Sequence, residues 1–172
     1  FGELLGAWLA DRWLAMPTDT RPVLLLYGDL GAGKTCLVQG LAQGLGLDEA
    51  VTSPTFALAQ HYSAPAATPL VHLDLYRLEL PAAADELFAQ EEEEAQALGA
   101  LMAVEWPGRL SFVPEGAWQL ALELADPADP DAGRGPAPLA RCPTFRGQRR
   151  GDRKRDVNRQ NQPQSDVHVT ED

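Results

Sequence analysis

Residues 28–35 read Gly28-Asp-Leu-Gly-Ala-Gly-Lys-Thr35, between the apolar run Val23–Tyr27 and a segment whose apolar residues recur at helical spacing. A glycine-rich loop between a strand and a helix lets successive backbone N–H groups point at an anion, and the positive end of the helix dipole strengthens their field. The spacing is that of a P-loop. It predicts an α/β fold that binds nucleoside triphosphate here, the alternative being a plain strand-to-helix turn.

The side chains at the end of this loop suit the same ligand. Lys34 supplies a mobile ammonium for the β- and γ-phosphates, and a hydroxyl such as that of Thr35 is the usual protein ligand of the accompanying Mg²⁺. An Asn-Lys-x-Asp motif that would read guanine is absent from the sequence, so ATP is the expected nucleotide. The expected nucleotide-binding residues of the loop are Asp29, Gly31, Ala32, Gly33, Lys34, Thr35 and Cys36.

The remaining pattern suits one α/β domain, which we expect to span residues 1–132. Amphipathic periodicity predicts helices over 3–15 and 81–98, the second with a proline near its start and Gly99 just past its end. Alternating or continuous apolar runs predict the strands. These are 23–27, 57–62, 70–76, 101–104 and 117–124, the second and third joined by the proline-rich connection 63–69.

Two acidic residues end predicted strands. Asp74 lies in His72-Leu-Asp-Leu-Tyr-Arg77, and Glu105 follows the run 101–104. Ligands gather at the carboxyl ends of strands in parallel α/β sheets, so both carboxylates can converge on the P-loop; a cap or a surface ion pair is the alternative for each. Ser53-Pro-Thr55 is either a switch that contacts the γ-phosphate or a helix-to-strand turn.

Charge is distributed unevenly along the chain. Residues 1–132 carry 5 basic and 20 acidic side chains, whereas 133–172 carry 9 basic and 5 acidic ones. The acidic body argues against direct RNA binding, since Lys and Arg supply most of that affinity. We expect 133–172 to be an irregular, disordered Pro/Arg-rich tail, either a basic arm for RNA or simply solvated. The four carboxylates Glu91–Glu94 are expected to form a solvated helix face rather than a metal site.

The ends and the cysteines support a cytoplasmic protein. No run of eighteen apolar residues or basic signal segment is present, so no membrane association is expected. A start at Phe1 rather than Met suggests that residues ahead of the first helix are absent. Cys36 and Cys142 are too few for a zinc cluster or a disulfide framework.

Four segments in this order resemble the TsaE family, also called YjeE, the small P-loop ATPase of bacterial tRNA threonylcarbamoyladenosine synthesis. They are 28–35, Ser53-Pro-Thr-Phe56, His72-Leu-Asp-Leu-Tyr-Arg77 and Val104-Glu-Trp-Pro107. The spacing is compatible across about residues 2–125. The P-loop is shared with many families, whereas the other three segments together point to this one.

The resemblance implies a mixed, mainly parallel sheet with helices on both faces, and an ATPase that supports the threonylcarbamoyl-transfer proteins TsaB and TsaD. Such a protein meets tRNA only indirectly, through that complex. Lys34 would bind phosphates, Thr35 and Glu105 would hold Mg²⁺, and Asp74 would polarise or position water. The implied catalytic residues are thus Lys34, Asp74 and Glu105.

Three further positions take roles from the same resemblance. Thr55 would belong to a switch near the γ-phosphate, and Trp106 matches a position important for activity through packing or a partner surface. Arg134 is a possible counterpart of an arginine that approaches the nucleotide, although the proline- and arginine-rich ending fits the family poorly.

Two other functions use the same loop. A small-molecule kinase needs an acceptor pocket and usually an arginine-bearing lid, and residues 1–132 hold four arginines, Arg12, Arg21, Arg77 and Arg109. A nucleotide-binding scaffold needs occupancy but no turnover, because binding alone shifts a population of states.

Overall fold

A computed structural model describes residues 2–123 and shows a five-stranded sheet. The strands are β1 (Leu24–Tyr27), β2 (Ala59–Tyr62), β3 (Leu70–Asp74), β4 (Leu101–Glu105) and β5 (Trp118–Ala121). Their order is β2-β3-β4-β1-β5, in which β2 pairs antiparallel with β3 and the other neighbours are parallel. The expected mixed, mainly parallel sheet is confirmed.

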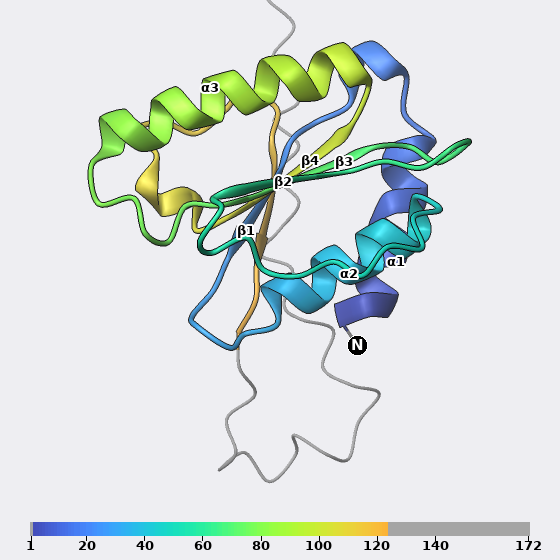
Figure 1. Cartoon of the computed structure of the whole chain (residues 1–172), viewed down its shortest axis with the longest axis horizontal. Helices are drawn as coiled ribbons and strands as arrows, with labels where there is room; N and C mark the ends of the chain where they lie inside the picture. The colour runs from blue at the N-terminus through green and yellow to red at the C-terminus, as the bar shows by residue number, and fades with distance from the viewer. Residues whose placement is uncertain (1, 124–172) are drawn as a thin grey trace, which may run out of the picture.

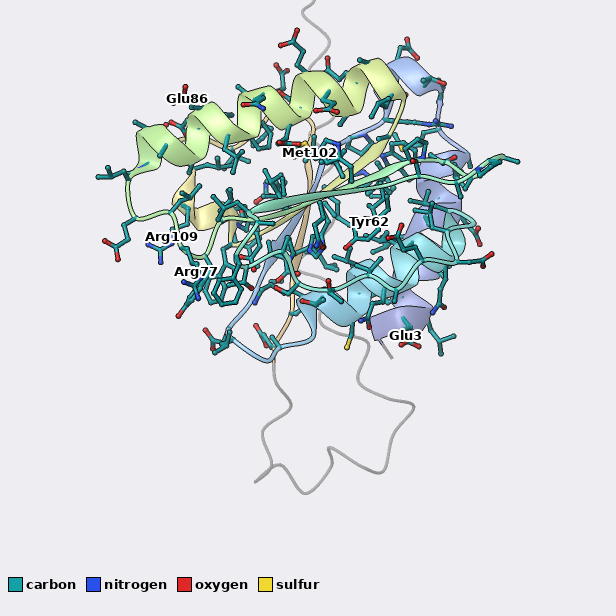
Figure 2. The ribbon with its side chains drawn as sticks, in the orientation of Figure 1. Glu3, Tyr62, Arg77, Glu86, Met102 and Arg109 are labelled. Atoms are coloured by element: carbon teal, nitrogen blue, oxygen red, sulfur yellow. The ribbon has the colours of Figure 1, made fainter. Side chains whose placement is uncertain are left out.

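Helices cover both faces of this sheet, as expected (Figure 1). They are α1 (Gly2–Leu14), α2 (Lys34–Gly44) and α3 (Pro81–Leu98), with 3-10 turns at Thr18–Thr20 and Pro107–Arg109. Helices α1 and α2 pack on one face, and α3 packs on the other. Glu86 lies on the solvent side of α3, the helix that crosses the top of the view (Figure 2).

The predicted elements are confirmed with local corrections. Helix α3 has the predicted limits, and Gly99 ends it with a φ of 62°. Strand β2 begins at Ala59 rather than 57, because the chain turns at Leu58, whose N–H donates to the Pro54 carbonyl. Strand β3 ends at Asp74, which binds the Tyr76 N–H and bends the chain there. The last strand occupies only 118–121, and the tail 133–172 lies outside the described residues.

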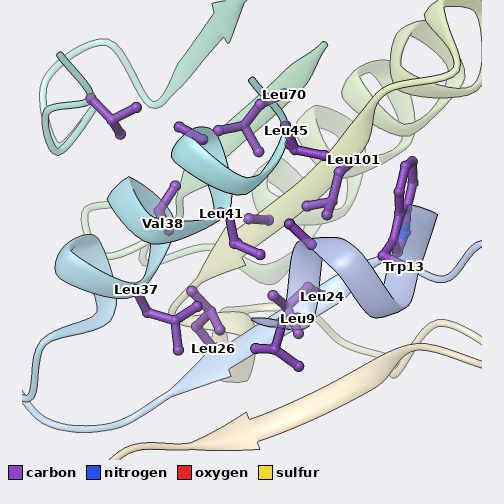
Figure 3. Packing of buried hydrophobic residues seen from close by; sticks show 14 of the residues in the cluster. Leu9, Trp13, Leu24, Leu26, Leu37, Val38, Leu41, Leu45, Leu70 and Leu101 are labelled. Carbon is purple, nitrogen blue, oxygen red and sulfur yellow. The ribbon is translucent and has the colours of Figure 1, made fainter. Parts of the chain in front are cut away.

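The larger apolar layer lies between the sheet and the helices α1 and α2 (Figure 3). Leu24 and Leu26 of β1 meet Leu37 and Leu41 of α2, and Leu9 of α1 closes the layer. Strand residues alternate between faces, so Leu25 instead packs on the α3 side. Burial on both faces is the usual state of a central parallel strand.

Two helices on the same face approach unusually closely. A Cβ added to Gly6 of α1 would lie 2.1 Å from the Leu37 carbonyl oxygen of α2, and one added to Gly40 would lie 2.0 Å from the Glu3 carbonyl oxygen. Both obstacles are backbone atoms, which cannot swing aside as a side chain does. Within residues 2–123, no helix is long and apolar enough to cross a membrane.

Gly6→Ala tests this helix contact. The added methyl group must push α1 from α2, and overpacking typically costs about 1–3 kcal/mol, more than the helix-propensity gain of about 1 kcal/mol. We expect the free energy of unfolding in urea to fall. The control is Gly108→Ala, where an added Cβ has no neighbour within 4 Å. A Gly6→Ala protein as stable as the wild type would contradict the packing described.

Candidate nucleotide-phosphate site

The P-loop connects the carboxyl end of β1 to the first residue of α2. Gly33 stands immediately before α2 with a φ of 93°, a left-handed conformation that side-chain-bearing residues rarely adopt. Gly28 and Gly31 also have positive φ. The loop therefore has the glycine-dependent backbone of a phosphate cradle, with Asp29 and Gly31 exposed and Ala32 partly so.

Lys34 is buried although it carries a charge. Its Nζ donates to the carbonyl oxygens of Gly28 and Asp29 at 2.8 and 2.9 Å. It also lies 4.2 Å from the centre of the Trp106 ring, within the range of a cation–π contact. A phosphate oxygen that approaches Nζ has to replace part of this set of contacts.

Thr35 and Glu105 meet beside the loop. The Thr35 Oγ1 donates to Glu105 Oε1 at 2.9 Å, across 70 residues of sequence. Glu105 is almost completely buried, and its Oε1 also lies 2.9 Å from His72 Nε2. A hydroxyl and a carboxylate are hard oxygen donors, the kind that Mg²⁺ prefers, so these two residues fit the predicted metal.

Asp74 instead organises the segment 53–55. Its Oδ2 accepts from Thr55 Oγ1 at 2.9 Å and from Ser53 Oγ at 3.1 Å. Its Oδ1 accepts the Tyr76 N–H at 3.0 Å, and the two hydroxyls lie 2.6 Å apart. Residues 53–55 lead into the turn at 55–57 and are anchored to a buried strand end, while the switch stays a prediction.

The strand register explains why these acids lie on one side of the sheet. Asp74 pairs with Glu105 across β3 and β4, and Glu105 pairs with Leu26 across β4 and β1. Leu26 faces α2, and residues paired in a sheet point to the same face. Both carboxylates consequently lie on the face that α2 covers, at the end of the sheet where the P-loop leaves β1.

Aromatic side chains flank the site. The Tyr76 and Trp106 rings have centres 4.9 Å apart, and the Arg77 guanidinium lies 4.3 Å from the centre of the Phe56 ring. Phe56 is 87% exposed, which is unusual for so large an apolar side chain. Trp106 adopts a φ of 60° directly after Glu105. The backbone thus turns sharply after Glu105, and this turn places the Trp106 ring against both Lys34 and Tyr76.

The expectation for Glu91–Glu94 is wrong in part. Glu91 is buried, and its Oε2 lies 2.5 Å from His61 Nε2, while Glu94 Oε1 lies 3.3 Å from His61 Nδ1. The three side chains offer ligand atoms within 4.8 Å of one another. Because both ring nitrogens already contact carboxylates, this cluster ties β2 to α3, on the sheet face opposite Glu105.

A cleft of about 450 Å³ lies at the other end of the sheet. Val23 and Ala100, which precede β1 and β4, line it together with the carboxylates Asp19, Glu92 and Glu115. Burial raises the pKa of the Glu92 carboxyl. Arg21 also lines this cleft, but the three carboxylates outnumber it and disfavour a polyphosphate, so the P-loop end is the better phosphate site.

The sequence predicts no role for His72, which contacts Glu105, and the structure gives no contact for two of the residues that it does predict. Exposed Cys36 follows Thr35 on α2, with no contact that assigns it a role. Arg134 lies outside the described residues. The segment 72–77 includes His72 without predicting a role for it; the available signal is the period-two spacing that puts His72 on the same face of β3 as Asp74.

A model of a known protein family matches most of the chain. The family model described as "Threonylcarbamoyl adenosine biosynthesis protein TsaE" matches residues 5–130. The chain belongs to the TsaE family. It therefore falls among proteins of tRNA threonylcarbamoyladenosine biosynthesis, as the resemblance implied.

Curated TsaE relatives share substantial identity with the chain. The Synechocystis protein is 46% identical over 110 residues, which are 60% of this chain and 68% of that protein. The Nostoc protein is 41% identical over 104 residues, 60% of this chain and 64% of its own length. The Streptomyces coelicolor protein is 40% identical over 122 residues, 69% of this chain and 80% of its own length. Each is named as a tRNA threonylcarbamoyladenosine biosynthesis protein.

A solved structure has a similar fold. The crystal structure of YdiB from Bacillus subtilis superposes with a TM-score of 0.50 at 28% sequence identity, covering 73% of this chain and 71% of YdiB. The TsaE-type arrangement of sheet and helices thus extends to a protein of low sequence identity.

Asp74→Asn tests the anchoring of the 53–55 segment. The amide keeps the shape of the carboxylate but removes the charge that accepts two hydroxyls, and hydrogen bonds to charged groups contribute about 1.5–3 kcal/mol. We expect amide hydrogen exchange over residues 52–58 to accelerate by roughly tenfold or more.

The matched control is Asp85→Asn. Asp85 accepts the N–H and the hydroxyl of Ser111 in the same two-bond manner, on the α3 side. This variant should loosen the chain near Ser111 and leave 52–58 unchanged. Unchanged exchange over 52–58 in Asp74→Asn would show that Asp74 does not hold the segment.

Proposed function

We propose that this chain binds ATP with Mg²⁺ and hydrolyses it to ADP and phosphate, as the accessory ATPase of a threonylcarbamoyl-transferase complex. The observation that carries the proposal is the meeting of Thr35 Oγ1 and Glu105 Oε1 at 2.9 Å, beside a P-loop whose lysine is buried. The chain itself would not modify tRNA. A cytoplasmic location, where tRNA is modified, belongs to the same proposal.

The phosphates are proposed to lie in the loop between β1 and α2. Its backbone N–H groups and the first turn of α2 supply positive partial charge, and Lys34 adds a full charge at the same place. The backbone of the loop and of the first turn of α2, rather than a positively charged side chain, would be the contribution of Asp29, Gly31, Ala32, Gly33 and Cys36 to nucleotide binding.

Thr35 and Glu105 are proposed to hold the metal. When bound, Mg²⁺ would offset the negative charge that develops on the phosphates during hydrolysis. Burial of Glu105 keeps its carboxylate from bulk water, and the bond to Thr35 fixes the distance between α2 and β4.

Asp74 and Thr55 are proposed to act together. The carboxylate that would position the attacking water is bonded to the hydroxyls of Ser53 and Thr55. Rotation of these hydroxyls toward a γ-phosphate would free Oδ2 to accept a proton from water. Catalysis would then depend on the 53–55 segment having engaged the nucleotide.

The proposed partners are the TsaB- and TsaD-type transfer proteins, which would bring the chain to tRNA indirectly. The support is chemical: Phe56 and Tyr76 are exposed beside the phosphate site, and large exposed apolar groups commonly mark interaction surfaces. The excess of acidic residues over 1–132 argues against direct contact with tRNA phosphates.

Nucleotide binding is tested by Lys34→Met, which keeps the aliphatic stem and removes the charge. At one hundred times its Kd a ligand stabilises the folded state by about 2.7 kcal/mol. We expect MgATP or MgADP to raise the free energy of unfolding of the wild type by this order and that of Lys34→Met far less. Arg12→Ala, on the exposed side of α1, is the control. Equal stabilisation of wild type and Lys34→Met would remove the lysine from the site.

Turnover is tested by phosphate release, with the purified chain alone and with TsaB and TsaD. We expect hydrolysis that Lys34→Met abolishes and Glu105→Gln lowers at least tenfold, since the amide is a weaker metal ligand. Bound ATP with no release in either condition would favour the scaffold. Transfer of phosphate to a small molecule rather than to water would favour the kinase.

A further inference from the structure

His72 is a fully buried histidine beside the proposed metal ligand. Its Nε2 lies 2.9 Å from Glu105 Oε1, and its Nδ1 is the one buried side-chain polar atom without a partner in residues 2–123. Its neighbours on the same strand, Val71 and Leu73, belong to the apolar core. An apolar residue would fill the position without leaving a polar atom unpartnered, so the imidazole costs stability that packing does not explain.

The sheet register sets the contact between the two residues. His72 pairs with Ala103, two residues before Glu105, and Asp74 pairs with Glu105 itself. His72 and Glu105 are therefore diagonal neighbours on one face, a separation that a long side chain can bridge. Ala103 between them has a short side chain that leaves the path open.

The carboxylate partner of Nε2 assigns the tautomer of His72. An ionised carboxylate only accepts hydrogen bonds, so Nε2 is the nitrogen that carries the hydrogen toward Glu105. Oε1 then accepts from two elements at once, from His72 on β3 and from Thr35 on α2. These are the two hydrogen bonds of the Glu105 carboxylate among the described residues.

We propose that His72 is a positioning residue, which holds the Glu105 carboxylate toward Thr35 so that both can bind Mg²⁺. The inference rests on the proposed function, because it concerns the same metal. A glutamate has three rotatable side-chain bonds, and the Thr35 hydroxyl alone leaves its carboxylate free to turn about that contact. The rigid imidazole on the neighbouring strand donates to the same oxygen, so Oε1 is held from a second direction. Partners of this kind typically change metal affinity or activity by 10–100-fold.

The test compares His72→Gln with His72→Leu. The glutamine Nε2 is as many bonds from the backbone as the histidine Nε2 and keeps a donor there, whereas leucine removes the donor. The probe is ADP, titrated by calorimetry in EDTA and across a series of MgCl₂ concentrations. Because Lys34 and the loop are unchanged, ADP affinity in EDTA should stay within about twofold in both variants.

The metal dependence should separate them. We expect His72→Leu to need 10–100-fold more MgCl₂ for half of the Mg²⁺-dependent gain in ADP affinity, and His72→Gln to stay within about threefold of the wild type. For ATP turnover, His72→Leu should lower kcat with little change in KM. His61→Leu is the matched control, since His61 lies on the neighbouring strand and contacts Glu91 on the opposite face. It should leave the MgCl₂ series unchanged.

Three results would overturn the proposal. They are an unchanged MgCl₂ series in His72→Leu, a glutamine variant as impaired as the leucine variant, and equal loss of ADP affinity in EDTA and in MgCl₂. If His72→Leu does not fold, His72→Asn replaces it: its shorter amide cannot reach Glu105, and it should behave as predicted for leucine. A wild type that binds MgADP but does not turn over ATP overturns the ATPase proposal, while the ADP series still decides the role of His72. The ATPase proposal is in turn decided by phosphate release alone, so the two proposals can fail separately.

Discussion

The parallel pairing of β4 with β1 is the constraint on which the site depends. It places Glu105 beside Leu26, one residue before β1 ends and two before the P-loop begins. Helix α2 starts from the P-loop and lies over the face that carries Glu105. The short side chain of Thr35, on the first turn of α2, therefore reaches the Glu105 carboxylate directly. The site depends on the strand order. In the chain, α3 separates β4 from β3, but in the sheet β4 lies between β3 and β1.

The polar groups of the site occupy a position that would otherwise be core. His72, Asp74 and Glu105 are buried on the sheet face that α2 covers, the face that also holds Leu26, Leu70 and Leu101. They remain compatible with folding because both oxygens of Asp74 and Oε1 of Glu105 accept hydrogen bonds, from the Thr35 hydroxyl, from the hydroxyls of the 53–55 segment and from the Tyr76 N–H. Hydrogen bonding in a dry layer also fixes geometry more tightly than solvated contacts would.

Local signals in the sequence predicted the parts of the molecule that depend on neighbours along the chain. The proline at the start of α3 and Gly99 at its end gave both limits, and the P-loop spacing gave the strand, the loop and the helix. Contacts between residues that are distant in the sequence could not be predicted from these local signals. Burial of Glu91 depends on His61, thirty residues earlier on a strand edge, and the partner of His72 is thirty-three residues later. The position of Asp74 at a strand end predicts a site residue, but its attachment to Ser53 and Thr55 is visible only in three dimensions.

An anion that binds to Lys34 must displace contacts that the ammonium already makes. This ammonium is surrounded by two carbonyl oxygens and the face of Trp106, which replace the water that a lysine usually keeps. An anion gains at Nζ only the difference between its own contact and those it displaces. A chain of phosphates would have more oxygens than a lone sulfate or inorganic phosphate with which to recover that difference at the loop amides. The same contacts that keep the buried charge satisfied would thus favour a longer polyanion in the proposed site, before any group recognises the nucleoside.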